Sequence, residues 1–370
     1  MNIATFSFPT TILFGPGTID RLPAELDKRN MKRPLLVTDA GLAAAAIVTR
    51  IRGLVPQAPV FAEVDPNPTE KNVLDGVAFY REHGCDSLIG VGGGSPLDAA
   101  KAIRLKATHS LDLAEYDDNI DGEARITANV PPYIAVATTA GTGSEVGRSA
   151  VIIIAKTNRK TVIFSPHLIP SLAIDDPELT VGLPPHITAG AGMDALTHNV
   201  EAYLSKGFHP ICDSIAIGGA RLASDNLPKV MANPAGIEAR GYMLLASMMG
   251  AMAFQKGLGA THSLAHPLSS EFGMHHGTAN AVLLPAVLEF NREAVPARMQ
   301  ELANSLGAEA IERVRELNRI CNIAPRLRDY AIPENALPEL AAKAIEDGCH
   351  QLNPRPCTEA DLLALYRAAW

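Results

Sequence analysis

The sequence predicts an α/β domain followed by an all-helical domain, and two observations support this fold class. In the first half, apolar runs typical of strands alternate with helix-like segments, which indicates a parallel sheet with helices on both faces. From Pro184 onward strand patterns nearly stop, and periodic segments rich in Ala, Leu and Met continue to the end. We therefore expect one domain over residues 1–180 and a second over residues 181–370, each with a sizeable core.

The predicted strands follow one another along the first half of the chain. Residues 4–15 are typical of a strand pair that ends at Gly15-Pro16. Three strand–helix units come next, with strands at residues 33–41, 59–64 and 86–95. Their helices are an Ala-rich segment after residue 41, a segment ending near His83, and a segment from Pro96 to about Thr108. Further strands are expected at residues 133–139, 150–155, 161–164 and 171–175.

Two glycine-containing loops follow predicted strands and suggest a phosphate site. Residues 92–101, GGGSPLDAAK, would let backbone N–H groups approach an anion, and Pro96 favours a helix start whose N-terminus attracts negative charge. The pattern is not GxGxxG, and glycines at this position often form only a tight turn. Residues 138–145, TTAGTGSE, are by themselves equally typical of a Ser/Thr-rich turn. Two such loops at strand ends of one sheet favour a nucleotide site.

Asp39 ends the first strand of the strand–helix series. A carboxylate at this position can accept both ribose hydroxyls of a dinucleotide and repel a 2′-phosphate. The same residue type is equally suited to capping a turn or helix, so both interpretations stand at this stage.

The second half concentrates imidazoles in a short stretch. Four of the eleven histidines lie within residues 262–276, and His262 and His266 are four residues apart, so they share one face of a helix. Asp194 and His198 have the same spacing, after a Pro184-Pro185 pair suited to helix entry. Each pair alone is more often an ordinary pair of polar residues, but together they favour a site for a hard-to-borderline divalent metal.

Composition narrows the class of protein. The net charge of −8, without basic runs, argues against nucleic acid as a partner. No signal-peptide pattern and no apolar run long enough for a bilayer are present, so we expect a cytoplasmic protein without membrane contact. The five scattered cysteines lack CxxC spacing, and we expect them to be reduced and buried.

These motifs together resemble the group III, iron-containing alcohol dehydrogenase family, with its dehydroquinate-synthase-like fold. The resemblance covers essentially the whole chain, through FGPG, NPT, GGGSPLDAAK, TTAGTGSEV, DPELT, GMDALTHNVEAYLS, GLGATHSLAHPL, HHGTANAVLLP and LNPRP. It implies a Rossmann-like nucleotide domain followed by a helical metal domain.

The resemblance also implies site residues. The metal ligands would be Asp194, His198, His262 and His276, the last because it directly precedes Gly277, and His266 would lie near the nicotinamide without being a ligand. The residues implied to bind the dinucleotide are Asp39, Asn67, Gly93, Gly94, Ser95, Asp98, Thr138, Thr139, Ser144 and Lys160. An Asp at the ribose position is similar to that of NAD-preferring members.

The expected chemistry is hydride transfer between NAD and an alcohol or aldehyde. A divalent metal, Fe(II) first and Zn, Co, Ni or Mn as alternatives, would stabilise the alkoxide as a Lewis acid. We expect His266 to relay the proton, because imidazole titrates near neutral pH.

The substrate is less determined. Arg148 could pair with an anionic tail, and Ser149 and Phe254 would shape the pocket; Lys256 could add a second positive charge. Equally, both cations could be solvated surface residues. A polyol dehydrogenase or a hydroxyacid–oxoacid transhydrogenase is the nearer alternative, and a metal- and nucleotide-binding sensor without turnover the farther one. We expect a homodimer or higher homo-oligomer, because the N-terminal strand pair resembles the family's dimerisation edge.

Overall fold

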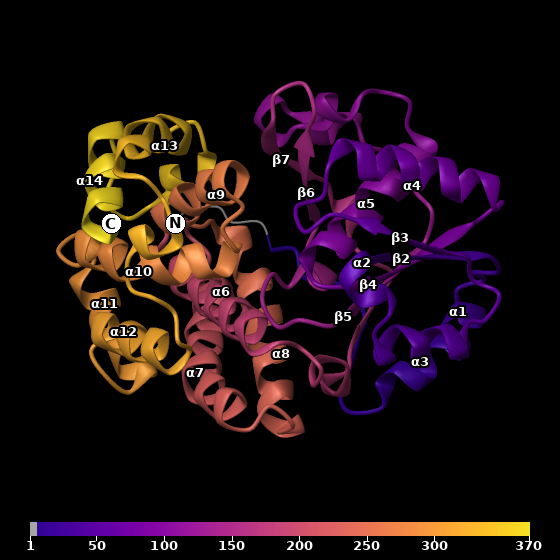
Figure 1. The fold of residues 1–370 in the computed structure, drawn as a ribbon, viewed down its shortest axis with the longest axis horizontal. Helices are drawn as coiled ribbons and strands as arrows, with labels where there is room; N and C mark the ends of the chain where they lie inside the picture. The colour runs from indigo at the N-terminus through magenta and orange to yellow at the C-terminus, as the bar shows by residue number, and fades with distance from the viewer. Residues whose placement is uncertain (1–5) are drawn as a thin grey trace. The chain divides into compact units, whose positions relative to one another are not determined.

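The computed structural model describes residues 6–370, which form two compact units (Figure 1). The α/β unit consists of Pro9–Thr139 and Ser144–Thr180. The helical unit consists of Val181–Trp370 together with Ala140–Gly143 and residues 6–8. Within residues 6–370, every helix is too short or too polar to cross a lipid bilayer.

The α/β unit contains all the strands found among the described residues. These are β1 (Ile12–Phe14), β2 (Pro34–Asp39), β3 (Val60–Val64), β4 (Ser87–Gly92), β5 (Tyr133–Ala137), β6 (Ser149–Ile154), β7 (Arg159–Phe164) and β8 (Leu172–Asp175). Its α-helices are α1 (Leu22–Lys28), α2 (Ala40–Ala43), α3 (Ala46–Leu54), α4 (Glu70–Glu82) and α5 (Gly94–Thr108).

Six of these strands form one parallel sheet in the order β1-β8-β5-β4-β2-β3. The chain leaves β2 toward β3 and then returns to β4 on the other side of β2, so the strand order reverses between β2 and β4. Ligands of open parallel sheets bind at such a reversal, beyond the carboxyl ends of the strands. A ligand site is therefore expected at the loops that follow β2, β4 and their neighbours.

Helices cover both faces of this sheet, as the alternating pattern predicted (Figure 1). Successive residues of β2 point to opposite faces. Leu35 and Val37 pack in the cluster that includes residues of α4 and α5, whereas Leu36 packs with Ile19, Ile51 and other residues of the α1 and α3 side. The sheet is thus buried on both sides and presents only its edges and loops.

Several sequence-based boundaries were wrong. The strand pair predicted at residues 4–15 is a single three-residue strand, β1, which pairs in parallel with β8, and residues 4 and 5 lie outside the described part. Strands β6 and β7 pair with each other as a separate antiparallel hairpin and are not part of the six-stranded sheet. The Ala-rich helix after residue 41 is divided into α2 and α3, and α5 begins at Gly94 instead of Pro96.

The helical unit holds the remaining α-helices around one large apolar core (Figure 1). They are α6 (Pro185–Leu204), α7 (Pro210–Ala232), α8 (Ile237–Ala253), α9 (Ala260–Phe272), α10 (His276–Asn291), α11 (Pro296–Leu306), α12 (Ala310–Ile320), α13 (Leu337–Ala344) and α14 (Glu359–Ala369). Helix α6 begins after Pro184 with Pro185 in its first turn, which suits proline because the first-turn N–H groups have no helical acceptor.

Two glycines let α6 and α10 approach each other closely. A Cβ atom on Gly277 would lie 2.0 Å from the backbone oxygen of Gly190, so a side chain cannot fit at this crossing. The close approach brings the start of α10 against the middle of α6, where Asp194 lies.

The cysteines are free, as expected, but only Cys212 and Cys321 are buried. Cys85, Cys349 and Cys357 are partly exposed, so the expectation of five buried cysteines was wrong.

Candidate metal and nucleotide sites

Three helices of the helical unit present the expected metal ligands. Asp194 and His198 lie one turn apart on α6 and therefore share one face of that helix. His262 lies in the first turn of α9, and His276 is the first residue of α10. The preceding His275 has a different position: it is the N-cap of α10, and its Nδ1 accepts a hydrogen bond from the backbone N–H of Thr278.

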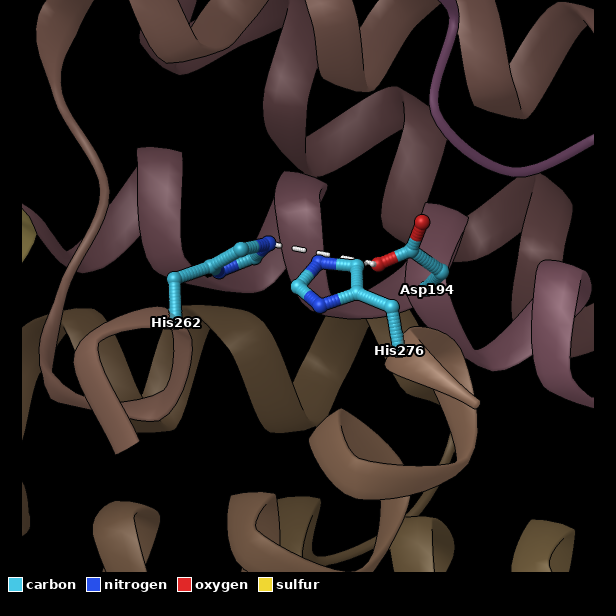
Figure 2. A group of neighbouring side chains, drawn as sticks. All are labelled: Asp194, His262 and His276. Carbon is cyan, nitrogen blue, oxygen red and sulfur yellow. Dashed lines mark ion pairs between the residues drawn. The ribbon is translucent and has the colours of Figure 1, made fainter. Parts of the chain in front are cut away.

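The Asp194 carboxylate lies among the three imidazoles. Its Oδ1 is 3.9 Å from Nε2 of His198, 3.9 Å from Nε2 of His262 and 3.6 Å from Nε2 of His276. Figure 2 shows His262 and His276, from two helices, approaching the carboxylate of Asp194, which comes from a third. Donors bound tetrahedrally to one ion at 2.0–2.2 Å stand roughly 3.4 Å apart. The distances from Asp194 are therefore close to the separation that a single divalent ion requires. The ligand atoms of Asp194, His262 and His276 all lie within 4.8 Å of one another, and His198 is outside this closer group.

Hydrogen bonds leave Nε2 of two imidazoles available as donors to a metal. Nδ1 of His198 lies 3.3 Å from the backbone oxygen of Gly141, and Nδ1 of His262 lies 2.6 Å from Oε2 of Glu201. Because an oxygen can only accept, the proton of each neutral ring is on Nδ1 and the lone pair is on Nε2. Glu201 also accepts from the backbone N–H groups of Gly259 and Thr261, so its carboxylate is fixed in place.

The pKa values of these two imidazoles are shifted in opposite directions, because only His262 is hydrogen-bonded to a buried carboxylate. Burial lowers the pKa of His198 to about 4, so this ring is neutral at physiological pH. Burial alone would lower the pKa of His262 as well, but the hydrogen bond and negative charge of Glu201 outweigh it and raise that pKa. The negative charge of Glu201 thus favours a positive charge at His262, and either a proton or a bound metal ion would supply it.

The amide of Asn280 contacts three of the four expected ligands. Its Nδ2 lies 2.8 Å from Oδ1 of Asp194, 3.2 Å from Nε2 of His276 and 3.4 Å from Nε2 of His262. Three acceptors thus converge on one donor group, while the Asn280 Oδ1 has no hydrogen-bond partner. The Asn280 NH₂ group is electropositive, and a cation could satisfy the same three acceptors in its place. These residues therefore fit a divalent metal.

His266 lies one turn after His262 on α9 and points to a different carboxylate. Its Nδ1 is 2.7 Å from Oδ2 of Asp347, and its ring stacks on that of His276 at 5.3 Å between centroids. The side chains of His266 and His276 are 22% and 24% exposed, whereas those of His262 and Asp194 are 2% and 4% exposed. The open side of the group is therefore the side of His266 and His276.

Phe254 and Lys256 precede α9 in a short 3-10 helix, η8 (Phe254–Lys256). The Phe254 ring lies 5.3 Å from the His198 ring, so it borders the ligand group. Lys256 is buried, and its Nζ donates to Oδ1 of Asp213 at 2.5 Å and to the backbone oxygen of Tyr203 at 2.7 Å. The alternative that Lys256 is a solvated surface residue was therefore wrong.

In the α/β unit, most of the expected nucleotide residues lie at one edge of the parallel sheet. Asp39 is the last residue of β2, Asn67 follows β3, and Thr138 and Thr139 follow β5. Gly93, Gly94 and Ser95 follow β4, where Gly93 caps α5. Because these strands are parallel and adjacent, their carboxyl ends meet at one edge.

Contacts between these loops show that they adjoin. A Cβ atom on Gly93 would lie 3.0 Å from Oγ1 of Thr139, and Oγ of Ser95 donates to the backbone oxygen of Pro66 at 2.5 Å. The Asp39 carboxylate accepts from the backbone N–H of Leu42 and so caps α2, which is the alternative role considered for it.

Asp98 and Ser144 form a hydrogen-bond network with a buried lysine, Lys101, to which the sequence analysis assigned no role. Oγ of Ser144 donates to Oδ1 of Asp98 at 2.6 Å, and the fully buried Lys101 donates from Nζ to Oγ of Ser144 at 2.8 Å and to the backbone oxygen of Ser149 at 2.8 Å. Burial raises the pKa of Asp98 and lowers that of Lys101. The network ties α5 to the second glycine loop and to β6.

The remaining candidates lie on the β6–β7 hairpin. Lys160 is opposite Ile153 in the hairpin, and the N–H of Ile153 donates to the backbone oxygen of Pro68, beside the loop that holds Asn67. Arg148 immediately precedes Ser149, and its guanidinium lies over the Phe164 ring at 5.1 Å.

Comparison with known proteins decides the family. Residues 9–177 match the family described as iron-containing alcohol dehydrogenase, and residues 188–370 match the C-terminal part of the same family. The chain belongs to the iron-containing alcohol dehydrogenase family. The resemblance expected from the motifs is thereby confirmed, as are the α/β-plus-helical fold and an oxidoreductase activity that interconverts an alcohol and an aldehyde or ketone.

Individual relatives of this dehydrogenase extend over nearly the full chain. The 4-hydroxybutyrate dehydrogenase of Cupriavidus necator is 42% identical over 362 residues, covering 93% of this chain and 94% of the relative. The 1,3-propanediol dehydrogenase of Klebsiella pneumoniae is 38% identical and covers 98% and 97%. Among solved structures, a 1,3-propanediol oxidoreductase has a TM-score of 0.96 at 38% identity, covering 100% of both chains. The sulfoacetaldehyde reductase of Bifidobacterium kashiwanohense in complex with NAD+ has a TM-score of 0.91 at 30% identity, covering 100% of this chain and 99% of the other.

Three polar residues beside the candidate metal ligands of the dehydrogenase were missed from the sequence. Glu201 follows Asp194 and His198 at helical spacing, and Asn280 follows His276 by four residues, so both could have been found by extending the helix pattern. Asp347 is 81 residues from its partner His266, and no local pattern indicates it.

Proposed function

We propose that Asp194, His198, His262 and His276 hold a divalent metal, Fe(II) first among the candidates, and that the enzyme transfers hydride between NAD and a small alcohol. The observation that supports this most directly is the convergence of three imidazole Nε2 atoms on one carboxylate oxygen within 3.9 Å. Nitrogen and oxygen donors without a thiolate suit Fe(II) and also accept Zn.

When bound, the metal would stabilise negative charge on the substrate oxygen, and the nicotinamide would exchange hydride with the substrate carbon. The protein's part is to hold these partners and to move one proton. Asp194 and His198 are fixed on one face of α6, and Glu201 orients His262 through Nδ1. These side chains are held in place before substrate arrives, which lowers the cost of organising the site.

His266 is the proton acceptor that the geometry favours. Its Nδ1–H donates to Asp347, so Nε2 carries the lone pair and can take a proton from a substrate hydroxyl. The Asp347 carboxylate would stabilise the imidazolium that forms. The partial exposure of His266 gives the proton a path to solvent.

The nucleotide would bind at the edge formed by the loops after β2, β3, β4 and β5. Gly93, Gly94 and Ser95 at the N-terminus of α5 suit the pyrophosphate, because backbone N–H groups and the helix dipole favour an anion there. Asp39 at the end of β2 suits the ribose hydroxyls and disfavours a 2′-phosphate, which supports NAD over NADP.

For the substrate, we propose an alcohol with an anionic group at its far end, bound by Arg148. Two relatives carry names with anionic compounds, 4-hydroxybutyrate and sulfoacetaldehyde. The Phe164 ring beneath the Arg148 guanidinium orients that cation, and a planar guanidinium can bind a carboxylate through two hydrogen bonds.

A matched pair of substrates tests this proposal. 4-Hydroxybutyrate and 1,4-butanediol have the same chain length and differ only in a carboxylate against a hydroxymethyl group. In Arg148→Ala, kcat/KM for 4-hydroxybutyrate should fall at least about tenfold more than for 1,4-butanediol. The control is Arg52→Ala, an exposed arginine of α3, which should leave the ratio unchanged. An equal loss for both substrates in Arg148→Ala would reject the anionic-tail proposal.

A further inference from the structure

Beside the metal group lies a second cluster with a different donor set. One nitrogen of His266, one carboxylate oxygen of Asp347 and the sulfur of Cys349 lie within 4.8 Å of one another. His266 comes from α9, whereas Asp347 and Cys349 come from the cap and first turn of the short 3-10 helix η11 (Gly348–Leu352). All three residues are partly exposed, although the Cys349 thiol itself is buried.

The cluster is held in place by its neighbours. Oδ1 of Asp347 accepts from the backbone N–H of Cys349 at 2.9 Å and from Oγ of Ser263 at 2.7 Å. Oδ2 accepts from Nδ1 of His266 at 2.7 Å. The carboxylate is thus the common partner of the imidazole and the cysteine, and it fixes both on one side of the site.

We propose that His266, Asp347 and Cys349 form a second metal site, selective for a thiophilic divalent cation such as Zn²⁺ or Cd²⁺. Imidazole nitrogen, carboxylate oxygen and thiolate sulfur are the three donor types that zinc uses in proteins, and three protein donors leave a fourth position for water. The sulfur separates this site from the Asp194 group, whose donors are nitrogen and oxygen only.

Binding requires one proton to leave. Burial and the Asp347 carboxylate raise the pKa of the Cys349 thiol, so the sulfur is protonated at neutral pH. The metal–sulfur bond forms as the S–H proton goes to solvent. At His266 we take Nδ1 as the donor atom, because it faces Asp347. Its proton leaves Nδ1 and a proton is taken up at Nε2, so the net release is one proton per metal ion.

This change would inhibit the enzyme if the proposed function is correct. With the metal on Nδ1, His266 carries its proton on Nε2 and can no longer accept one from a substrate hydroxyl. The ion would also replace the hydrogen bond between His266 and Asp347. The second site therefore acts as an inhibitory site for thiophilic metals, and this consequence rests on the role proposed for His266.

Cadmium is the probe, because a cadmium–thiolate bond gives an ultraviolet charge-transfer band that nitrogen and oxygen donors do not give. The metal-loaded full-length enzyme is titrated with CdCl₂, and absorbance, bound cadmium and released protons are followed. The variant is Cys349→Ser, which keeps a hydrogen-bonding side chain but removes the sulfur. The matched control is Cys357→Ser, another partly exposed free cysteine. Asp194→Ala removes a donor of the first group and keeps the second cluster.

We expect the band, with one cadmium and one proton per chain, in the unmodified enzyme, in Cys357→Ser and in Asp194→Ala, and its loss in Cys349→Ser. Absence of the band from the unmodified enzyme, or its persistence in Cys349→Ser, would overturn the proposal. A band that is lost in Asp194→Ala would also overturn it, because the sulfur would then belong to the first metal group.

The activity assay separates this inference from the proposed function. Cadmium inhibition that remains in Cys349→Ser measures replacement of the metal at the Asp194 group, so only the excess in the unmodified enzyme is assigned to the second site. A band without excess inhibition would uphold the second site and reject His266 as the proton acceptor. An active enzyme without a band would reject the second site and leave the proposed function standing.

Discussion

Two histidines one turn apart on α9 are oriented in the same way but differ in exposure. Glu201 accepts from Nδ1 of His262, and Asp347 accepts from Nδ1 of His266, so both rings carry a lone pair on Nε2. The difference is exposure: the His262 side chain is 2% exposed and the His266 side chain 22%. A buried ring suits a permanent ligand, whereas a ring at the open side suits exchange of a proton with substrate and solvent.

Replacing Glu201 by Gln should weaken metal binding without removing a ligand. The glutamine amide keeps one oxygen, but its NH₂ group would face a backbone N–H that donates to the carboxylate in the unmodified enzyme. The substitution also removes the negative charge that favours His262 as a ligand. We expect the affinity for Co²⁺, measured by competition with a chelator, to fall about 10–100-fold.

The matched control is Glu238→Gln, at an exposed position in the first turn of α8, which should bind Co²⁺ as the unmodified enzyme does. Unchanged Co²⁺ affinity in Glu201→Gln would show that His262 is held by helix packing alone.

At the level of elements, the crossing of α6 and α10 sets the distance between Asp194 and His276. Gly190 and Gly277 meet backbone to backbone at this crossing. The same Gly277 is close to Asp194, because a Cβ on the glycine would lie 2.9 Å from the Cβ of the aspartate. The glycine is therefore required for close approach, since its own φ is not in the left-handed region.

Gly277→Ala should separate the two helices and damage the metal group. The added methyl would lie 2.0 Å from the Gly190 oxygen, which is backbone and cannot rotate away. We expect a loss of about 1–3 kcal/mol in unfolding free energy, together with weaker metal binding.

Gly53→Ala is the control, a helical glycine at which we expect alanine to stabilise the protein. Gly53 lies in α3 with open space around its Cα, so alanine there should stabilise the protein by about 0.5–1 kcal/mol. Denaturant unfolding of both variants measures the difference, and a Gly277→Ala variant as stable as Gly53→Ala would contradict the packing argument.

Over the whole molecule, function is divided between the two units by their architecture. The parallel sheet collects loops from separate strands at one edge, where backbone N–H groups are available for an anion. The helical unit instead collects side chains from α6, α9 and α10 into a buried group that the surrounding core keeps rigid. On the site assignment proposed above, the α/β unit would bind the nucleotide and the helical unit would bind the metal.

Metal removal should lower the stability of the helical unit in a way that depends on Asp194. An ion that binds only the folded protein stabilises it by about 2.7 kcal/mol at a free concentration 100 times its Kd. Trp370 is the only tryptophan and lies in the helical unit, so its fluorescence reports unfolding of that unit.

We expect the thermal midpoint to fall on chelation and to recover with added metal. The midpoint of Asp194→Ala should not respond to metal, whereas that of the control Asp225→Ala, at an exposed position of α7, should respond normally. A metal response that survives in Asp194→Ala would place the stabilising ion elsewhere.

Features that depend on spacing within one element could be predicted from the amino-acid sequence. Alternating apolar runs predicted the parallel sheet, and the four-residue spacing of Asp194 and His198 on one helix followed from the helical repeat. The glycine loops after strands were visible for the same reason, because a loop's place relative to its own strand is local information.

Contacts between groups far apart in the chain became visible from the folded structure. Glu201 and His262 are 61 residues apart, and Lys256 is buried against Asp213 although its local sequence fits a surface position. Likewise β1 pairs with β8, the strand most distant from it along the chain, and not with a neighbour in a hairpin. Such pairings depend on how whole helices and strands pack, so a repeat within one segment cannot reveal them.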